Sequence, residues 1–227
     1  MISDLIDLLF PKVCAGCKAF LLKNEKVICT NCRHELPLSQ FHLNVENDAF
    51  KAFYGRIAVE FVAPMLLFHK KGIVQELIHS LKYRGHQEIG TVLGNWYASE
   101  LKELPIIKEI DFIIPVPLHK KRLKKRGFNQ VTTFGKALSA DLEIIYNDAI
   151  LVRNLHSKTQ SQKGFDDRIQ FKKPVFDVVF DYSVHNKHFL LIDDVMTTGT
   201  TLEQCSIALL KIPGAKISIV TMAISHL

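Results

Sequence analysis

The stretch of residues 189–201 constrains the fold more than any other part of the sequence. It begins with four apolar residues, Phe-Leu-Leu-Ile, which predict a strand buried on both faces, as strands in parallel sheets are. Asp193 and Asp194 follow at the carboxyl end of this strand, where open α/β sheets place their ligands. The pattern therefore predicts an α/β fold with a ligand site at this end of the strand.

The residues after the acid pair have the composition of a phosphate-binding turn. Threonine hydroxyls and backbone N–H groups can hold a phosphate at the start of a helix, whose dipole favours the anion, and a glycine lets the backbone approach closely. An alternative is a turn that only caps the helix, since Asp and Thr are good N-cap residues. Capping requires one such residue and explains neither the paired acids nor the threonines. The turn consists of Thr197, Thr198, Gly199, Thr200 and Thr201.

This segment resembles the phosphoribosyl pyrophosphate (PRPP) motif of type I phosphoribosyltransferases. The resemblance implies that Asp193 and Asp194 are the catalytic acid pair and bind the ribose hydroxyls. It also implies that the threonine turn holds the 5′-phosphate of PRPP.

Two CxxC pairs near the start predict a structural metal site. Cys14 and Cys17 form the first pair and Cys29 and Cys32 the second, with eleven residues between the pairs, which is zinc-ribbon spacing. Four thiolates leave no position for water, so a Zn²⁺ ion there would be structural. Two disulfides are the alternative, and they need an oxidising compartment. His34 could replace one thiolate, although a role outside the metal site suits it better.

The composition indicates one main domain with a small appendage. Of the 227 residues, 48% are hydrophobic and 23% are charged, and no apolar run approaches the ~20 residues that cross a bilayer. The opening segment has acids where a secretory signal would have basic residues. We therefore expect a cytoplasmic protein without a membrane span.

The positive charge is concentrated in one place. The formal net charge is +6, and six basic residues lie within 120–126. Such a cluster can bind a polyphosphate, a nucleic acid or an acidic partner, or it can be a solvated surface loop.

Hydrophobic periodicity predicts alternating strands and helices, and hence a doubly wound, mostly parallel sheet. The expected domains are a cysteine knuckle at residues 1–36, a connector at 37–56 and the main domain at 57–227. Residues 153–174 have few apolar positions, which predicts a long mobile loop. Cys205 is expected to pack in the core. Helices are expected at 72–85, 86–101 and 131–140, and strands at 110–114, 144–146, 149–152, 175–180, 189–192 and 217–224.

Three features together resemble the ComF (GntX) family: the knuckle, the segment 115–130 and the PRPP motif. Residues 81–85 (Leu-Lys-Tyr-Arg-Gly) and 159–162, with Arg168 downstream, extend the resemblance over nearly the whole chain. The resemblance implies a type I phosphoribosyltransferase fold with an N-terminal zinc finger. It also implies a link to competence, which is the import of transforming DNA as a single strand.

Further site residues follow from the same resemblance. The turn after residue 114 corresponds to the pyrophosphate loop, Mg²⁺ would bridge the diphosphate, and the 153–174 loop would close over the site. The place of a base-selecting hood is taken by the knuckle and residues 36–70, and nothing identifies the acceptor. The implied pyrophosphate residues are Val116, Pro117, Leu118, Arg122 and Arg126, and the candidate lid cations are Lys158, Lys163 and Arg168.

Three functions are compatible with these features. The first is a PRPP-binding protein of DNA uptake that also binds single-stranded DNA through charge and aromatic stacking. The second is a phosphoribosyltransferase of nucleotide or cofactor metabolism that releases pyrophosphate. The third is an inactive scaffold that senses PRPP and docks a competence ATPase. The candidate DNA contacts are Lys120, Lys121, Lys124, Lys125 and Phe128, with Phe20 of the knuckle as a further aromatic residue.

Overall fold

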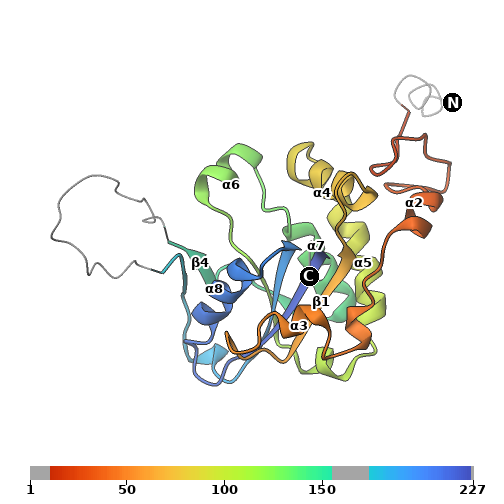
Figure 1. Cartoon of the computed structure of the whole chain (residues 1–227). Helices are drawn as coiled ribbons and strands as arrows, with labels where there is room; N and C mark the ends of the chain where they lie inside the picture. The colour runs from red at the N-terminus through yellow and green to blue at the C-terminus, as the bar shows by residue number, and fades with distance from the viewer. Residues whose placement is uncertain (1–10, 155–173, 226–227) are drawn as a thin grey trace, which may run out of the picture.

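A five-stranded sheet forms the centre of the protein. The computed structural model describes residues 11–154 and 174–225. All neighbouring strands of the sheet are parallel, in the order β1-β7-β6-β2-β3, and Figure 1 shows helices on both sides of it. The expected doubly wound α/β class is confirmed. The strands are β1 (Phe61–Leu67), β2 (Phe112–Pro115), β3 (Ile145–Tyr146), β6 (His188–Met196) and β7 (Lys216–Ile224), and a separate antiparallel pair is formed by β4 (Leu151–Arg153) and β5 (Phe176–Val178).

Helices cover the two faces of the sheet and bury one core on each. On one face α4, α5 and α7 contribute to a core that also includes knuckle residues. On the other face α8 packs with α3 and the β4–β5 pair. The helices are α2 (Thr30–Glu35), α3 (Asp48–Lys51), α4 (Ile73–Tyr83), α5 (Glu88–Leu101), α6 (Lys120–Arg126), α7 (Thr132–Leu142) and α8 (Thr200–Leu209), with 3₁₀ turns at Phe41–Leu43, Pro105–Glu109 and Tyr182–Val184.

The chain leaves β2 and β6 toward opposite faces of the sheet. After β2 it reaches α7 on one face, and after β6 it reaches α8 on the other. These strands are neighbours, with Pro115 opposite Ile192. Such a switch point is where α/β proteins bind ligands, so the topology places the expected site between the turns that follow these two strands.

Two features of the fold differ from the sequence expectations. The basic segment, expected as a turn or loop, is the helix α6. Strand β1 was not expected, because Pro64 interrupts its apolar pattern. Proline is tolerated there because β1 pairs with β7 alone within the sheet.

The connector packs against the main domain. The backbone N–H of Ser39 donates to Met65 O (2.9 Å) along the outer edge of β1. The side-chain amide of Asn47 donates to Val62 O (2.8 Å). Ala49 and Phe53 are fully buried in the core beside α8. This packing brings the end of the connector close to the turn that precedes α8.

Candidate active site

The acid pair lies inside β6, because this strand continues to Met196. Consecutive strand residues point to opposite faces of a sheet, and the two carboxylates do so here. Asp194 is 5% exposed, and its Oδ2 lies 2.8 Å from Nζ of Lys82 on α4. Asp193 is on the α8 side, where its charge contributes to the raised pKa of Cys205. Cys205 itself is fully buried in the core, as expected.

Asp193 has an unusual protonation equilibrium. Burial and the negative charge of Asp194 raise its pKa to about 8, although the N–H of Asp194 and the Lys82 ammonium oppose the shift. Its Oδ1 accepts the backbone N–H of Asp194 (2.8 Å). Near neutral pH the carboxyl group is therefore largely protonated and can both donate and accept a hydrogen bond.

The threonine turn lies at the start of α8. Gly199 is the N-cap residue, with φ +74°, and no side chain caps the helix there. The hydroxyls of Thr198 and Thr200 are 3.0 Å apart. The capping alternative therefore does not describe this turn, because neither Asp193 nor Asp194 caps the helix. A helix N-terminus without a side-chain cap leaves backbone N–H groups that can bind an anion.

Arg56 holds this turn from the connector. Its guanidinium donates to Thr198 O (3.1 Å) and Ala52 O (3.0 Å) and forms an ion pair with Glu203 of α8. The ring of Phe53 packs against the same turn, since a Cβ atom added at Gly199 would lie 3.1 Å from it. The sequence pattern gave no signal for Arg56, which is separated from Thr198 and Glu203 by more than 140 residues.

The turn after β2 lies directly beside the acid pair. The N–H of Val116 donates to Ile192 O (2.9 Å), one residue before Asp193. The side-chain amide of Asn129 holds the turn by donating to Val116 O (3.0 Å). Val116 is buried, whereas Pro117 and Leu118 are partly exposed. The structure thus brings the expected pyrophosphate turn next to the strand that carries the expected sugar-binding acids.

Helix α6 exposes most of its positive charge. No residue of α6 is buried. Its start is capped by His119, whose Nδ1 accepts the N–H of Lys121 (3.1 Å), and it ends at Gly127 with φ +84°. Within the described ranges, no carboxylate pairs with Lys120, Lys121, Arg122, Lys124 or Lys125.

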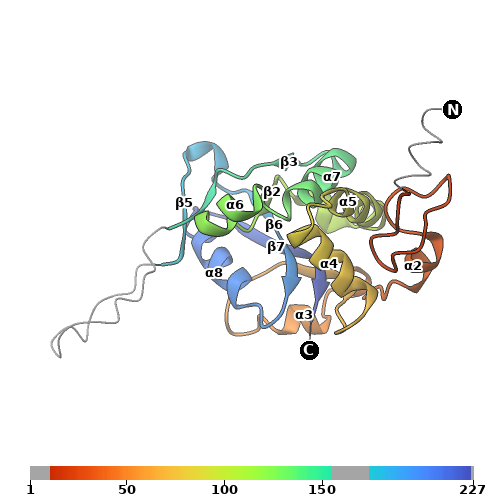
Figure 2. The same ribbon diagram turned by 90° about the horizontal axis from the view of Figure 1, so that it is seen from above.

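The arginines of α6 point toward different neighbours. Arg126 hydrogen-bonds Gln130 and lies over the ring of Tyr83 on α4, 5.6 Å from its centroid. Burial lowers the pKa of Arg153 of β4, and the charge of Arg122 contributes to the same shift. Phe128 is half-buried against the core on the α4 side. Seen from above in Figure 2, the ends of β6 and β7 lie between α6, α4 and α8.

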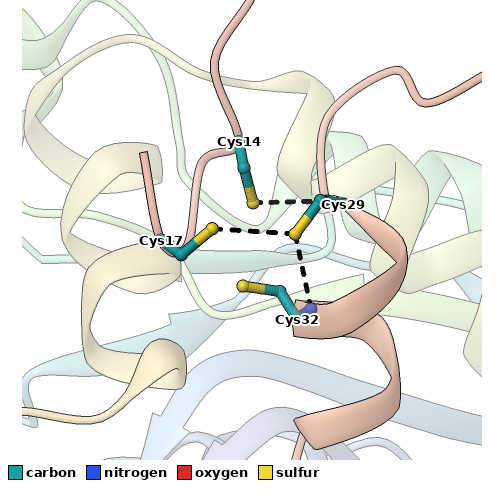
Figure 3. A group of neighbouring side chains, drawn as sticks. All are labelled: Cys14, Cys17, Cys29 and Cys32. Carbon is teal, nitrogen blue, oxygen red and sulfur yellow. Dashed lines mark hydrogen bonds between the residues drawn. The ribbon is translucent and has the colours of Figure 1, made fainter. Parts of the chain in front are cut away.

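The four cysteines converge into one cluster. Their sulfur atoms all lie within 4.8 Å of one another, and Figure 3 shows the four side chains grouped together. No disulfide joins the five cysteines of the chain. Burial opposes ionisation of Cys14, but backbone N–H donors, chiefly that of Cys29, lower its pKa to about 7. In a ZnS₄ tetrahedron with bonds of about 2.3 Å the sulfurs are roughly 3.8 Å apart. The cluster could therefore hold a metal ion, and the group that could hold it comprises the four cysteines and does not include His34.

The knuckle packs on α4 rather than projecting into solvent. A Cβ atom at Gly16 would lie 2.9 Å from the side chain of Ile73, the first residue of α4. Lys18 pairs with Glu76 of the same helix (3.5 Å). Cys14 and Cys32 share a buried core with α4 and α5. One face of α4 thus supports the cysteine cluster, while Lys82 of the same helix reaches the acid pair.

The sequence of the chain is similar to those of several known proteins. No protein-family model matches it. DNA utilization protein YhgH of Escherichia coli is 26% identical over 212 residues, covering 91% of this chain and 88% of the relative. Competence protein F of Haemophilus influenzae is 26% identical over 215 residues (91% and 94%), and competence protein ComFC of Bacillus subtilis is 26% identical over 206 residues (85% and 81%). The chain is a homologue of these proteins. The resemblance expected from the sequence is confirmed.

Comparison with solved structures finds an adenine phosphoribosyltransferase and a UMP synthase. Adenine phosphoribosyltransferase of Leishmania tarentolae has a TM-score of 0.37 and 13% identity, covering 66% of this chain and 74% of that one. The UMP synthase of Leishmania donovani has a TM-score of 0.36 and 15% identity, covering 65% and 24%. At these TM-scores the likeness carries no conclusion of its own, so the fold class stated above follows from the sheet topology.

The remaining expectations concern the loop and the membrane. Lys158, Lys163 and Arg168, the candidate lid cations, lie outside the described residues. Among the described helices, none combines the length and the apolar character that crossing a bilayer requires.

Proposed function

We propose that this protein is a PRPP-binding, phosphoribosyltransferase-like protein that acts in DNA uptake. One observation carries the proposal: an acid pair, a threonine turn at a helix N-terminus and the turn after β2 meet at one switch point of a parallel sheet. An anion and a polyhydroxylated sugar are the chemistry that these groups bind. The names of the relatives supply the biological context.

Each part of PRPP has a counterpart in this arrangement. The exposed N–H groups and hydroxyls of Thr198 and Thr200 receive the 5′-phosphate, with Gly199 permitting close approach. Asp193 and Asp194 receive the ribose hydroxyls. The carboxylate of Asp194 is oriented by Lys82, which already binds its Oδ2 (2.8 Å).

The diphosphate would lie at the turn after β2, within reach of the basic residues. Burial is the main cause of the lowered pKa of Arg153, and the charge of Arg122 adds to it. A diphosphate bound by these two arginines would offset their repulsion through charge-assisted hydrogen bonds. Mg²⁺ would accompany the diphosphate, whose oxygens are the hard ligands it prefers, and would assist the departure of pyrophosphate.

The cysteine cluster and α6 complete the proposal. Zn²⁺ in the cluster would supply folding energy to a segment too small to have its own core. The exposed lysines of α6 would bind the backbone of single-stranded DNA, which needs closely spaced positive charge without base recognition.

Calorimetric titration of the zinc-loaded protein with PRPP and Mg²⁺ tests the central point. We expect binding that is lost when Asp194→Asn is combined with Thr200→Val, and retained in Asp148→Asn, which changes an exposed carboxylate outside the site. Circular dichroism would check that each variant folds. Absence of PRPP binding by the folded parent protein would refute the proposal. Titrations with ribose 5-phosphate and with pyrophosphate alone would separate the two halves of the site.

A further inference from the structure

The cysteine cluster is accessible to solvent on one side. Cys17 is exposed, whereas Cys14, Cys29 and Cys32 are buried. Along the chain, residues 14–16 are buried and residues 17–20 are exposed, so the chain reaches the surface of the knuckle at Cys17. Cys17 is therefore the cysteine of the cluster that small dissolved reagents reach first.

The sulfur of Cys17 contacts a second sulfur. Its Sγ lies 3.6 Å from Sγ of Cys29, and Figure 3 shows these two side chains pointing toward each other. Cys29 is held in place because its N–H donates to Sγ of Cys14 (3.2 Å) and its Sγ accepts the N–H of Cys32 (3.4 Å). An accessible cysteine beside a second one is the arrangement of oxidation-sensitive pairs, in which the first reacts and the second resolves.

The metal ion proposed for this cluster would keep the pair reactive. A thiol that coordinates a metal ion is deprotonated, and the thiolate is the form of cysteine that attacks an oxidant. A structural Zn²⁺ site needs four ligands, and cysteine supplies its ligand as a thiolate. A disulfide between two of the four cysteines would leave two thiolates, and the cluster would lose the ion.

We propose that Cys17 is a site of oxidation by peroxides, with Cys29 as its resolving thiol. The Cys17 thiolate attacks one oxygen of hydrogen peroxide, the O–O bond breaks, and a sulfenic acid and a hydroxide ion form. The Cys29 thiolate then attacks the oxidised sulfur, so that an S–S bond forms, the S–O bond breaks and a second hydroxide ion leaves. Two thiolates are oxidised to one disulfide, and one hydrogen peroxide is reduced to two hydroxide ions.

The disulfide would also affect α4. Cys17 lies between Gly16 and Lys18, and both of these residues contact α4. Movement of Cys17 toward Cys29 would therefore disturb the support of this helix, whose Lys82 pairs with Asp194. Oxidation would then weaken PRPP binding. This last step rests on the proposed function, whereas the oxidation of Cys17 does not.

The experiment treats the zinc-loaded full-length protein with hydrogen peroxide and follows zinc release with a colorimetric chelator. Mass spectrometry of a tryptic digest without reductant maps the disulfide. Trypsin leaves one CxxC pair in residues 13–18 and the other in residues 27–33, so a Cys17–Cys29 bond cross-links the two peptides and fragmentation identifies both cysteines. We expect this disulfide to form in step with zinc release. Cys205, which is fully buried, should stay reduced.

Two matched variants test the role of exposure. Cys17→Ser and Cys14→Ser each remove one sulfur of the cluster, but only Cys17→Ser removes the exposed one. Disulfide formation in the knuckle should be about tenfold or more slower in Cys17→Ser than in Cys14→Ser. The disulfide map of the parent protein tests the proposal even if neither variant folds.

The outcomes separate the oxidation site from the proposed function. A first disulfide within either CxxC pair, or oxidation of Cys17 that is no faster than that of Cys205, would refute the proposal. A fall in PRPP affinity of roughly fivefold or more on oxidation, reversed by dithiothreitol and Zn²⁺, supports regulation of the site. Unchanged affinity of the oxidised protein would show that the disulfide does not act on the site. If the disulfide forms and PRPP does not bind even the reduced protein, the proposed function fails and the oxidation site stands.

Discussion

At the scale of single residues, Asp193 lowers the stability of the fold in which it lies. Its pKa is raised to about 8, so the folded state favours the protonated carboxyl group. The stabilisation from this protonation is fully present at pH values below the unfolded-state pKa, and it is lost as the pH rises toward and through 8. Ionised Asp193 then repels the carboxylate of Asp194, and the N–H of Asp194 and the Lys82 ammonium offset only part of this cost.

We therefore predict that Asp193→Asn makes the folded protein more stable at alkaline pH. Asparagine has the shape of the protonated acid and does not ionise, so the variant should gain roughly 1–3 kcal/mol over the parent above pH 8 and little near pH 4. Urea denaturation across this pH range measures the difference. A stability difference that does not change with pH, or that resembles the effect of the exposed change Asp148→Asn, would contradict the prediction.

Arg56 is expected to act on ligand binding through the threonine turn. Because its guanidinium fixes Thr198 O and pairs with Glu203, Arg56→Gln should let the turn relax and weaken PRPP binding by about fivefold. The effect on stability should be small, since Arg56 is partly exposed. Arg33→Gln, which removes an exposed arginine of the knuckle, is the control. Equal PRPP affinity in the parent and in Arg56→Gln would show that the turn holds its shape unaided.

Sequence reasoning could identify the contiguous site residues and not their distant partners. The acid pair and the threonines lie within nine residues of one another, so their spacing alone carries the chemistry. Lys82 and Arg56 reach the same site from 112 and 142 residues away. Their lysine and arginine side chains resemble any solvated surface charge until the fold brings them to their partners.

At the scale of secondary structure, the basic segment was predicted as a turn or loop, and it is the helix α6. Six like charges within seven residues disfavour a helix through repulsion between residues four apart. The two ends of the segment favour the helix, because His119 caps its start and Gly127, with positive φ, follows its last residue. The strand β1 was missed because it contains Pro64. An interior proline is acceptable only in an edge strand, and the sequence does not indicate which strand lies at the edge of the sheet.

The exposed lysines of α6 allow a test of DNA binding that leaves the sugar site unchanged. Reversing Lys120, Lys121, Lys124 and Lys125 to glutamate should weaken single-stranded DNA binding by more than tenfold at low salt. Each lost phosphate contact should reduce the slope of log K against log salt by roughly 0.7. Filter binding or fluorescence anisotropy at several salt concentrations measures both quantities.

A matched variant makes this test specific. Reversing Lys102 and Lys108, which are exposed and precede β2 at the other end of the sheet, should change DNA affinity little. PRPP binding should be kept in both variants. If the four-lysine variant keeps its DNA affinity and its salt slope, the DNA surface lies elsewhere.

At the scale of the whole molecule, α4 links the cysteine cluster to the acid pair. Its first residue contacts Gly16, Glu76 pairs with Lys18, and Lys82 pairs with Asp194. Between these contacts Val74, Leu77 and Leu81 are buried in the core that includes Cys14 and Cys32. A rigid helix fixed at one end by the knuckle and at the other by a carboxylate will transmit a loss of order from one end to the other.

Removing the metal from the knuckle should therefore affect the distant site. We predict that chelation, or Cys17→Ser, increases amide hydrogen exchange in Ile73–Tyr83 while exchange in Thr200–Leu209, on the opposite face, changes less. PRPP affinity should fall by roughly fivefold or more, because Lys82 no longer orients Asp194, and adding Zn²⁺ back should restore it after chelation. Protein shown to have lost its zinc, yet with unchanged exchange in α4 and unchanged PRPP affinity, would mean that the knuckle and the site are independent.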